Sequence, residues 1–251
     1  MSRLSGRSGT IGSPEDGEVS SPDPPPTTRV RGPSVGGEEG TAAKWQLAGL
    51  ALLLGALALT LVAAGPGTVP GDIAVARAIQ QPPSATIDRA ASVASLIGAD
   101  FPSAVVIAVI GIVLLIILGR RDLALFLGAA AGLRAVGPVL KVLIASPRPT
   151  AEAVVIVAKS DGLGFPSGHA LGAALLYGAI AILAPQVVAD RLAARAIQGV
   201  SIALMILIAL SRIRLGVHWP SDVAGGLLFG LGVIFLLQGL FLSWRRAAVK
   251  R

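Results

Sequence analysis

The chain has 251 residues, of which 53% are hydrophobic and only 14% are charged. This composition lies outside the usual range of a soluble globular domain and indicates an integral membrane protein. The formal net charge of +7 does not by itself indicate a nucleic-acid partner, because many basic residues lie in short segments beside apolar runs, as cytoplasmic flanks do. Since the chain has no cysteine, disulfides and thiolate metal sites are excluded.

The chain divides into a polar tail, an apolar domain and a short basic end. Residues 1–44 are rich in Gly, Pro, Ser and charge, and they hold too few apolar side chains to offset the entropy of ordering. We therefore predict a disordered cytoplasmic tail over 1–44, a six-span domain over 45–244 and a basic cytoplasmic tail over 245–251. Because the first apolar run follows a long polar segment, we interpret it as a retained span and not as a cleaved signal peptide.

Six apolar runs of about 17 to 23 residues are long enough to cross a bilayer as helices. They cover residues 45–65, 103–119, 123–145, 168–186, 196–212 and 221–243. The segment 66–102 is only moderately apolar, and its pattern leaves open whether it forms short helices along the membrane interface. We therefore predict an all-α fold, an integral membrane bundle of about six transmembrane helices. The glycine pairs Gly128/Gly132 and Gly226/Gly230 have the spacing of closely packed helices.

Basic residues in the connecting loops set the expected orientation. When the spans alternate, these residues fall on one side of the membrane, and the positive-inside rule makes that side cytoplasmic. They are Arg120, Arg121, Arg191, Arg195, Arg245, Arg246, Lys250 and Arg251. We therefore expect a multi-pass protein of the cell membrane with both termini in the cytoplasm. The polar segments 146–167 and 212–220 then lie on the extracytoplasmic face.

Three polar patches lie at the outer ends of spans three to six, and they contain both histidines of the chain. The first patch is Lys141 followed after six residues by Arg148-Pro149, the second is Pro166-Ser167-Gly168-His169, and the third holds Ser211-Arg212, His218 and Asp222. Together they provide cations, two imidazoles, a carboxylate and a small-residue turn at a predicted helix start. We therefore expect the active site at the outer ends of these spans.

Such a set of groups is suited to phosphoryl transfer, which depends mostly on positioning and on stabilising the charge of the phosphoryl oxygens. Arg148 and Arg212 can each donate to two oxygens, and Lys141 adds a point charge. Ser167 and Gly168 lie where the fourth span should begin, so backbone N–H groups and the positive end of the helix dipole would face an anion.

The two imidazoles supply the remaining chemistry. One can attack phosphorus while the other protonates the leaving oxygen. Asp222, four residues after His218, is near enough to hold that ring in one tautomer. Pro220 suits the first turn of the sixth span, which would place His218 just before the helix and Asp222 in its first turn.

The three patches, K-x6-RP, PSGH and SR-x5-H-x3-D, resemble the signature of the type 2 phosphatidic acid phosphatase superfamily, which also contains bacterial acid phosphatases and vanadium haloperoxidases. Every defined position of that signature is filled, in order, over residues 141–222. The six-span layout is similar to the membrane-bound lipid phosphatase branch of the superfamily. The resemblance therefore implies a lipid phosphatase built on a helical membrane bundle.

The resemblance also implies a role for each residue. His218 would be the nucleophile that forms a phosphohistidine, Asp222 would orient it, and His169 would act as general acid and later activate water. Five residues would bind the phosphoryl group: Lys141, Arg148, Ser167, Gly168 and Arg212. No metal and no cofactor are implied. The expected function is hydrolysis of a lipid phosphomonoester or diphosphate, either phosphatidate-like or a polyprenyl diphosphate.

Three alternative functions stay open from the sequence. A phosphotransferase to a lipid or glycolipid acceptor would use the same phosphohistidine. A vanadate-dependent haloperoxidase would hold vanadate in the phosphate pocket, although such proteins are soluble and this chain has uninterrupted apolar spans. A non-catalytic protein could bind or transport an anionic lipid. In each case we expect the partners to be a lipid phosphate and the bilayer and not nucleic acid, and the oligomeric state is not predicted.

Arg134 lies deep in the third predicted span, where a charged side chain is costly and is usually functional or paired. It precedes Lys141 by seven residues and therefore lies on roughly the same helix face, two turns inward. Our hypothesis is that Arg134 lines a polar path below the phosphate site. The alternative is that its side chain extends toward the cytoplasmic surface.

Overall fold

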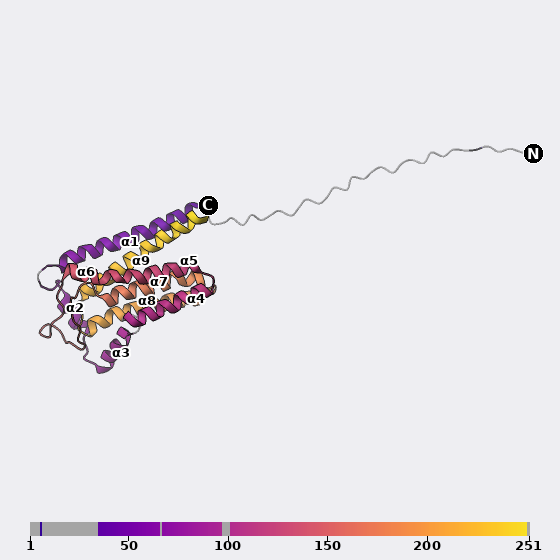
Figure 1. The fold of residues 1–251 in the computed structure, drawn as a ribbon. Coiled ribbons are helices and arrows are strands. Elements are labelled where there is room, and N and C mark those ends of the chain that lie inside the picture. The colour runs from indigo at the N-terminus through magenta and orange to yellow at the C-terminus, as the bar shows by residue number, and fades with distance from the viewer. Residues whose placement is uncertain (1–5, 7–34, 66, 97–100, 250–251) are drawn as a thin grey trace, which may run out of the picture. The chain divides into compact units, whose positions relative to one another are not determined.

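The structure is a computed structural model that describes residues 6, 35–65, 67–96 and 101–249. Within this part of the chain all regular secondary structure is helical, which confirms the predicted all-α fold (Figure 1). The helices are α1 (Val35–Ala63), α2 (Asp72–Ile79), α3 (Ala85–Leu96), α4 (Phe101–Ile117), α5 (Arg121–Gly132), the 3-10 helix η1 (Leu133–Ala135), α6 (Val136–Ile144), α7 (Gly168–Val187), α8 (Arg191–Arg214) and α9 (Pro220–Val249).

The predicted tail falls mainly on residues outside this description, namely 1–5 and 7–34. Helix α1 begins at Val35, ahead of the expected start of the first span at residue 45. The basic end of the chain is helical as far as Val249, because α9 continues past the predicted boundary at residue 244. Both helices therefore extend beyond the apolar runs that the sequence marks.

Five helical stretches of the described residues are long and apolar enough to cross a membrane. They are Gly40–Ala63, Arg121–Ile144, Gly168–Val187, Arg191–Arg214 and Pro220–Val249. The remaining predicted span, 103–119, corresponds to α4, a shorter apolar helix of 17 residues. At about 25 Å it falls slightly short of a typical hydrocarbon core. The membrane bundle is thus confirmed, with one of its apolar helices shorter than the others.

The third span is interrupted where the sequence predicted a continuous helix over 123–145. A single turn of 3-10 helix, Leu133–Ala135, separates α5 from α6. Pro138 lies one turn further on and has no N–H group to donate to the carbonyl of Arg134, so the α-helical ladder cannot be complete at this point. Helix α6 then ends at Ile144, and its C-cap Ala145 has a left-handed φ of 52°.

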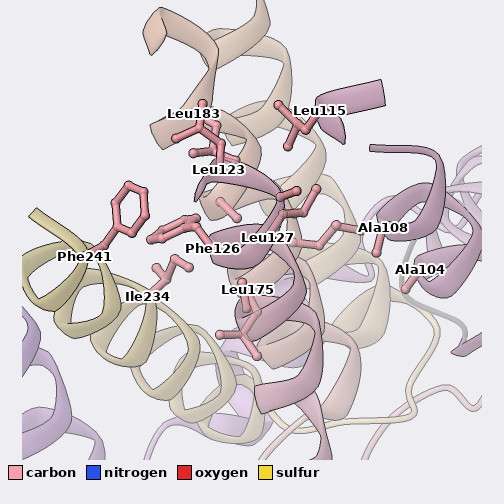
Figure 2. Packing of buried hydrophobic residues seen from close by; sticks show 14 of the residues in the cluster. Ala104, Ala108, Leu115, Leu123, Phe126, Leu127, Leu175, Leu183, Ile234 and Phe241 are labelled. Carbon is pink, nitrogen blue, oxygen red and sulfur yellow. The ribbon is translucent and has the colours of Figure 1, made fainter. Parts of the chain in front are cut away.

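Helix α7 lies in the middle of the bundle and packs against α5, α8 and α9. Figure 2 shows the apolar side chains between α4, α5, α7 and α9, with Phe126 of α5 directed toward Phe241 and Ile234 of α9. The rings of Phe126 and Phe241 have centroids 5.2 Å apart. Because lipid is as apolar as these side chains, the helices are held together here by close packing and not by exclusion of water.

Glycines allow α9 to approach two neighbouring helices closely. A Cβ atom on Gly230 would lie 2.8 Å from the carbonyl oxygen of Leu171 in α7, and one on Gly49 would lie 2.8 Å from that of Gly232. Such distances are shorter than normal contacts, so only glycine fits at these crossings. The close packing predicted for Gly226 and Gly230 is therefore confirmed, whereas a Cβ on Gly132 would meet nothing within 4 Å.

The segment between the first two spans forms the two short helices α2 and α3, which pack against the ends of α8 and α9. Asp88 of α3 forms an ion pair with Arg214 at the end of α8, with Asp88 Oδ1 and Arg214 Nε 2.7 Å apart. Gln80 donates to the carbonyl of Val155 at 2.7 Å and accepts from the N–H of the same residue at 3.1 Å. The α2–α3 segment therefore fixes the loops at one end of the bundle.

Candidate active site

The three polar patches of the sequence meet at one end of the bundle, where α6 and α8 end and α7 and α9 begin. Ser167 is the N-cap of α7, and its hydroxyl accepts from the N–H of Ala170. Helix α9 begins at Pro220, so His218 precedes the helix and Asp222 lies in its first turn, as predicted. Local rules of helix initiation thus place these residues at the same end of the bundle.

His218 and Asp222 form a buried pair at the centre of this region. His218 Nδ1 lies 3.1 Å from Asp222 Oδ2, and the two side chains are 2% and 0% exposed. The same oxygen accepts from the backbone N–H of Trp219 at 3.0 Å. Asp222 Oδ1 has no hydrogen-bond partner among the described residues. The carboxylate is therefore fixed through one oxygen, and that oxygen determines how the imidazole ring lies.

The other ring nitrogen of His218 faces a cation. Nε2 lies 3.3 Å from Arg148 Nη1. A guanidinium can only donate, so Nε2 must carry the lone pair and Nδ1 the proton, which is the tautomer of a nucleophilic imidazole. Burial, with Arg148, Lys141 and Arg212 nearby, holds the pKa of His218 well below its usual value. The ring is consequently neutral near pH 7.

Lys141 and Arg148 attach the loop after α6 to this pair. Lys141 Nζ donates to the carbonyl of Leu163 at 2.8 Å, and Arg148 Nε donates to that of Gly162 at 3.0 Å. Arg148 Nη1 also donates to the carbonyl of Val217, beside His218, at 2.6 Å. Burial has the largest effect on the pKa of Arg148 and lowers it. The guanidinium still stays charged at any physiological pH. Both cations therefore lie beside the imidazole and order the loop.

The start of α7 is held against the start of α9. The N–H of Ser167 donates to the carbonyl of Asp222 at 2.9 Å. A Cβ atom on Gly226 would lie 2.6 Å from the carbonyl oxygen of Ser167, so glycine is needed for this approach. Gly168 and His169, the first two residues of α7, are both half-buried. The start of α7 thus contacts Asp222, and the same turn of helix provides the first N–H groups of α7 and the ring of His169.

Arg212 lies at the end of α8 and is also buried. Its carbonyl accepts from the N–H groups of Val217 and His218, at 3.2 and 3.3 Å, and closes the turn that presents His218. Its guanidinium donates through Nη1 to the hydroxyl of Ser95 in α3. Its charge acts on both Lys141 and His218, which places it in the same cationic cluster.

Three residues of this region carry no signal in the sequence. A Cβ on Gly164 would lie 2.9 Å from Asp222 Oδ2, so only glycine leaves room for the carboxylate. Asp72 of α2 is buried and accepts from the N–H and the hydroxyl of Ser221, at 2.9 and 2.6 Å, and so caps α9 from outside the helix. Ser95 supports Arg212. Each lies far in the sequence from the residue that it contacts, so no local motif could have indicated it.

An all-helical membrane protein with a buried His–Asp pair and a cluster of cations at one end of its bundle is the class that this structure defines. The profile of the PAP2 superfamily matches residues 122–246, a range that contains all three polar patches. The chain belongs to the PAP2 superfamily, and the resemblance expected from the sequence is confirmed.

Individual relatives agree with this assignment. The decaprenylphosphoryl-5-phosphoribose phosphatase of Mycobacterium tuberculosis is 36% identical over 174 residues, which cover 65% of this chain and 86% of that protein. Phosphatidylglycerophosphatase B of Bacillus subtilis is 34% identical over 110 residues, or 42% of this chain and 51% of the relative. The match therefore spans about half the length of that second relative.

A solved structure shows the same architecture. The crystal structure of a transmembrane PAP2 type phosphatidylglycerolphosphate phosphatase from Bacillus subtilis superposes with a TM-score of 0.68 at 25% sequence identity. The match covers 76% of this chain and 94% of that chain. The similarity extends well beyond the polar patches and includes most of the helical bundle.

Proposed function

We propose that this protein is a membrane phosphatase that hydrolyses a lipid phosphate through a phosphohistidine at His218. The observation that carries the proposal is the position of the His218 ring between Asp222 and Arg148. Asp222 holds Nδ1, while Nε2 keeps its lone pair beside the guanidinium of Arg148. A neutral imidazole whose Nε2 lone pair faces a fixed cation is the arrangement needed to attack an anionic phosphoryl group.

In the first step His218 Nε2 attacks phosphorus, forming an N–P bond as the bond from phosphorus to the lipid oxygen breaks. The leaving oxygen takes a proton from the imidazolium of His169 at the start of α7. The positive charge that develops on the His218 ring is stabilised by Asp222 through the contact at Nδ1. Arg148, Lys141, Arg212 and the first N–H groups of α7 compensate the charge of the phosphoryl oxygens.

In the second step water attacks the phosphohistidine and the N–P bond breaks. The neutral His169 left by the first step accepts a proton from the water, which returns both imidazoles to their starting states. Inorganic phosphate leaves with the oxygen that water supplied. Before either step, Lys141 and Arg148, which donate to the carbonyls of Leu163 and Gly162, must share their N–H groups with the incoming phosphate.

The position of the site supports a lipid as substrate. The His218–Asp222 pair lies at the ends of helices that are long and apolar enough to cross a membrane. In a bilayer such a position would let a lipid present its headgroup without leaving the membrane. The opposite end of the bundle is basic: Arg120 and Arg245 both donate to Gln186, at 2.6 and 3.1 Å. By the positive-inside rule we assign that end, and with it both termini, to the cytoplasm and the site to the extracytoplasmic face.

The names of the relatives support a choice among the candidate substrates. Their names describe lipids that carry a phosphate on glycerol or on ribose, with a second phosphoryl group toward the lipid. We therefore place lipid phosphomonoesters first among the substrates of this protein, with polyprenyl diphosphates as the other candidate.

Phosphate release by the purified protein from a panel of lipid phosphates, with His218→Ala as control, tests the proposal. We expect turnover by the wild type, none by the variant, and an acid-labile, base-stable phosphoenzyme only in the wild type. Adding a second lipid with a free hydroxyl group separates hydrolysis from transfer, because a transferase would form a new phospholipid in place of free phosphate. Equal activity of His218→Ala and wild type would overturn the mechanism.

A further inference from the structure

A groove lies beside the candidate site, in the membrane-spanning part of the bundle. It has a volume of about 540 Å³ and lies between α4, the interrupted third span and α7. Its walls are largely small or apolar, and include Val105, Pro138 and Leu171. Its upper part is lined by Lys141 and Gly168, two of the residues that we assign to phosphate binding. The groove therefore borders the proposed phosphate site at these two residues.

Arg134 also lines this groove, from the 3-10 turn that interrupts the third span. Its guanidinium lies against Gly172 of α7, where an added Cβ would be only 2.2 Å from Arg134 Nη1. Gly172 thus makes room for the guanidinium. Because Gly172 is the fifth residue of α7, the side chain points toward the start of that helix and not toward the basic end of the bundle, as the alternative interpretation of the sequence required.

The spacing between the two cationic positions of the groove defines what could bind there. Gly172 follows Gly168 by four residues, so the Arg134 guanidinium lies about 6 Å deeper than the start of α7. A ligand that reaches both positions needs a second anionic group about one helical turn from the first. The two phosphorus atoms of a diphosphate share a bridging oxygen and are too close together, whereas glycerol or a pentose places several atoms between two phosphates.

We infer that Arg134 binds a second, lipid-proximal phosphate of the substrate. The preferred substrate is then a lipid whose terminal phosphomonoester is joined through a short polyol or sugar to a phosphodiester. This inference rests on the proposed function, because it takes the terminal phosphate to lie at His218. It assigns Arg134 to substrate selection: the groove holds the start of the lipid chain, and the guanidinium distinguishes lipids with two separated phosphates from those with one.

The test compares three lipids with identical acyl chains in mixed micelles: phosphatidylglycerol phosphate, phosphatidate and diacylglycerol diphosphate. The measured quantity is the ratio of kcat/KM for phosphatidylglycerol phosphate to that for each of the other two. We expect Arg134→Met to lower this ratio about tenfold or more, mainly through KM, because a charge-assisted hydrogen bond to the substrate is lost. Arg134→Lys, which keeps the charge without the fork, should lower it less.

Two controls make the result specific. Arg120→Met removes an arginine at the opposite end of the bundle and should leave the ratio unchanged. Gly172→Ala keeps Arg134 but displaces its guanidinium, so it should lower the ratio as Arg134→Met does.

An Arg134→Met variant that loses the same factor on all three lipids would overturn the inference, since a purely structural role affects every substrate alike. A wild type that hydrolyses all three lipids equally well would also overturn it, while leaving the proposed function intact. A wild type that releases phosphate from none of these lipids, and from no polyprenyl diphosphate either, would instead overturn the proposed function.

Discussion

Replacing Asp222 by Asn removes the charge behind His218 with little change of shape. In the wild type a single oxygen, Oδ2, accepts from both the His218 ring and the N–H of Trp219, and Oδ1 has no partner among the described residues. An amide that places its oxygen in the position of Oδ2 can keep both hydrogen bonds. Its NH₂ group then occupies the position of Oδ1. We therefore expect the Asn variant to fold and to keep the reactive tautomer of His218.

The loss of rate then comes from the missing charge. His218 Nδ1 and Asp222 Oδ2 are 3.1 Å apart. At this distance a fully charged pair interacts by about 5 kcal/mol with an effective dielectric constant of about 20. If about half of the positive charge has developed on the ring in the transition state, the carboxylate supplies about 2 to 3 kcal/mol, which is about 10² in kcat. If the amide instead turned its NH₂ group toward Nδ1, the wrong tautomer would form and the loss would rise to about 10⁴.

The assay is single-turnover formation of phosphoenzyme, together with steady-state phosphate release at saturating lipid. The charge argument predicts a loss of about 10² in phosphorylation rate for Asp222→Asn and a larger loss for Asp222→Ala, which also frees the ring. If the Asn variant phosphorylates within threefold of the wild type, Asp222 does not stabilise the charge of His218 and the proposed role is wrong.

Four further predictions follow from the same contacts. Burial and nearby cations hold the pKa of His218 well below its usual value, and only the neutral ring attacks. We therefore expect kcat/KM to stay high as the pH falls to about 6.5 and to be lost only below that pH. A loss of kcat/KM that begins above that pH would contradict the neutral nucleophile. His169→Ala should slow an alkyl phosphate far more than an aryl phosphate with a good leaving group, and equal losses would exclude a general acid there. Gly164→Ala should lower kcat about tenfold, because the new methyl group pushes on Asp222 Oδ2, and a kcat equal to that of the wild type would show that the carboxylate can move freely. Asp72→Ala should lower the free energy of unfolding by about 1 to 3 kcal/mol, because it leaves a buried N–H without an acceptor. Asp72→Asn should lower it less. Equal thermal unfolding of the two variants would refute this capping role.

Much of the fold could be predicted because the bilayer imposes a simple rule on the sequence. A helix must be apolar over roughly the thickness of the hydrocarbon core, so the runs beginning near residues 168, 196 and 221 appear directly as α7, α8 and α9. The predicted helix boundaries were less accurate where a proline lies inside an apolar run. Pro138 leaves the helical ladder incomplete inside the third span, and the sequence pattern alone, which is apolar on both sides, gave a continuous helix over 123–145.

The residues of the candidate site could be identified in the sequence because several of them lie only a few residues apart. His218 and Asp222 are four residues apart, and Ser167 and His169 flank one helix start, so local spacing already indicates what they can do together. The sequence also placed Arg134 below the phosphate-binding residues, on the helix face of Lys141, and both residues line one groove. It could not reveal Gly164, Ser95 or the contact of Arg134 with Gly172.

The sequence by itself determined the helical membrane bundle, the order of the polar patches and the choice of candidate reactive groups, because each depends on residues within one helix or one turn. The tertiary structure alone decided which remote residues support them. Asp222 needs the space left by Gly164, α9 is capped by Asp72 from a different helix, and Arg134 reaches the groove only because Gly172 of α7 lacks a side chain. Such contacts arise from how helices distant in the sequence pack, and packing is set by the three-dimensional fit of all of them at once.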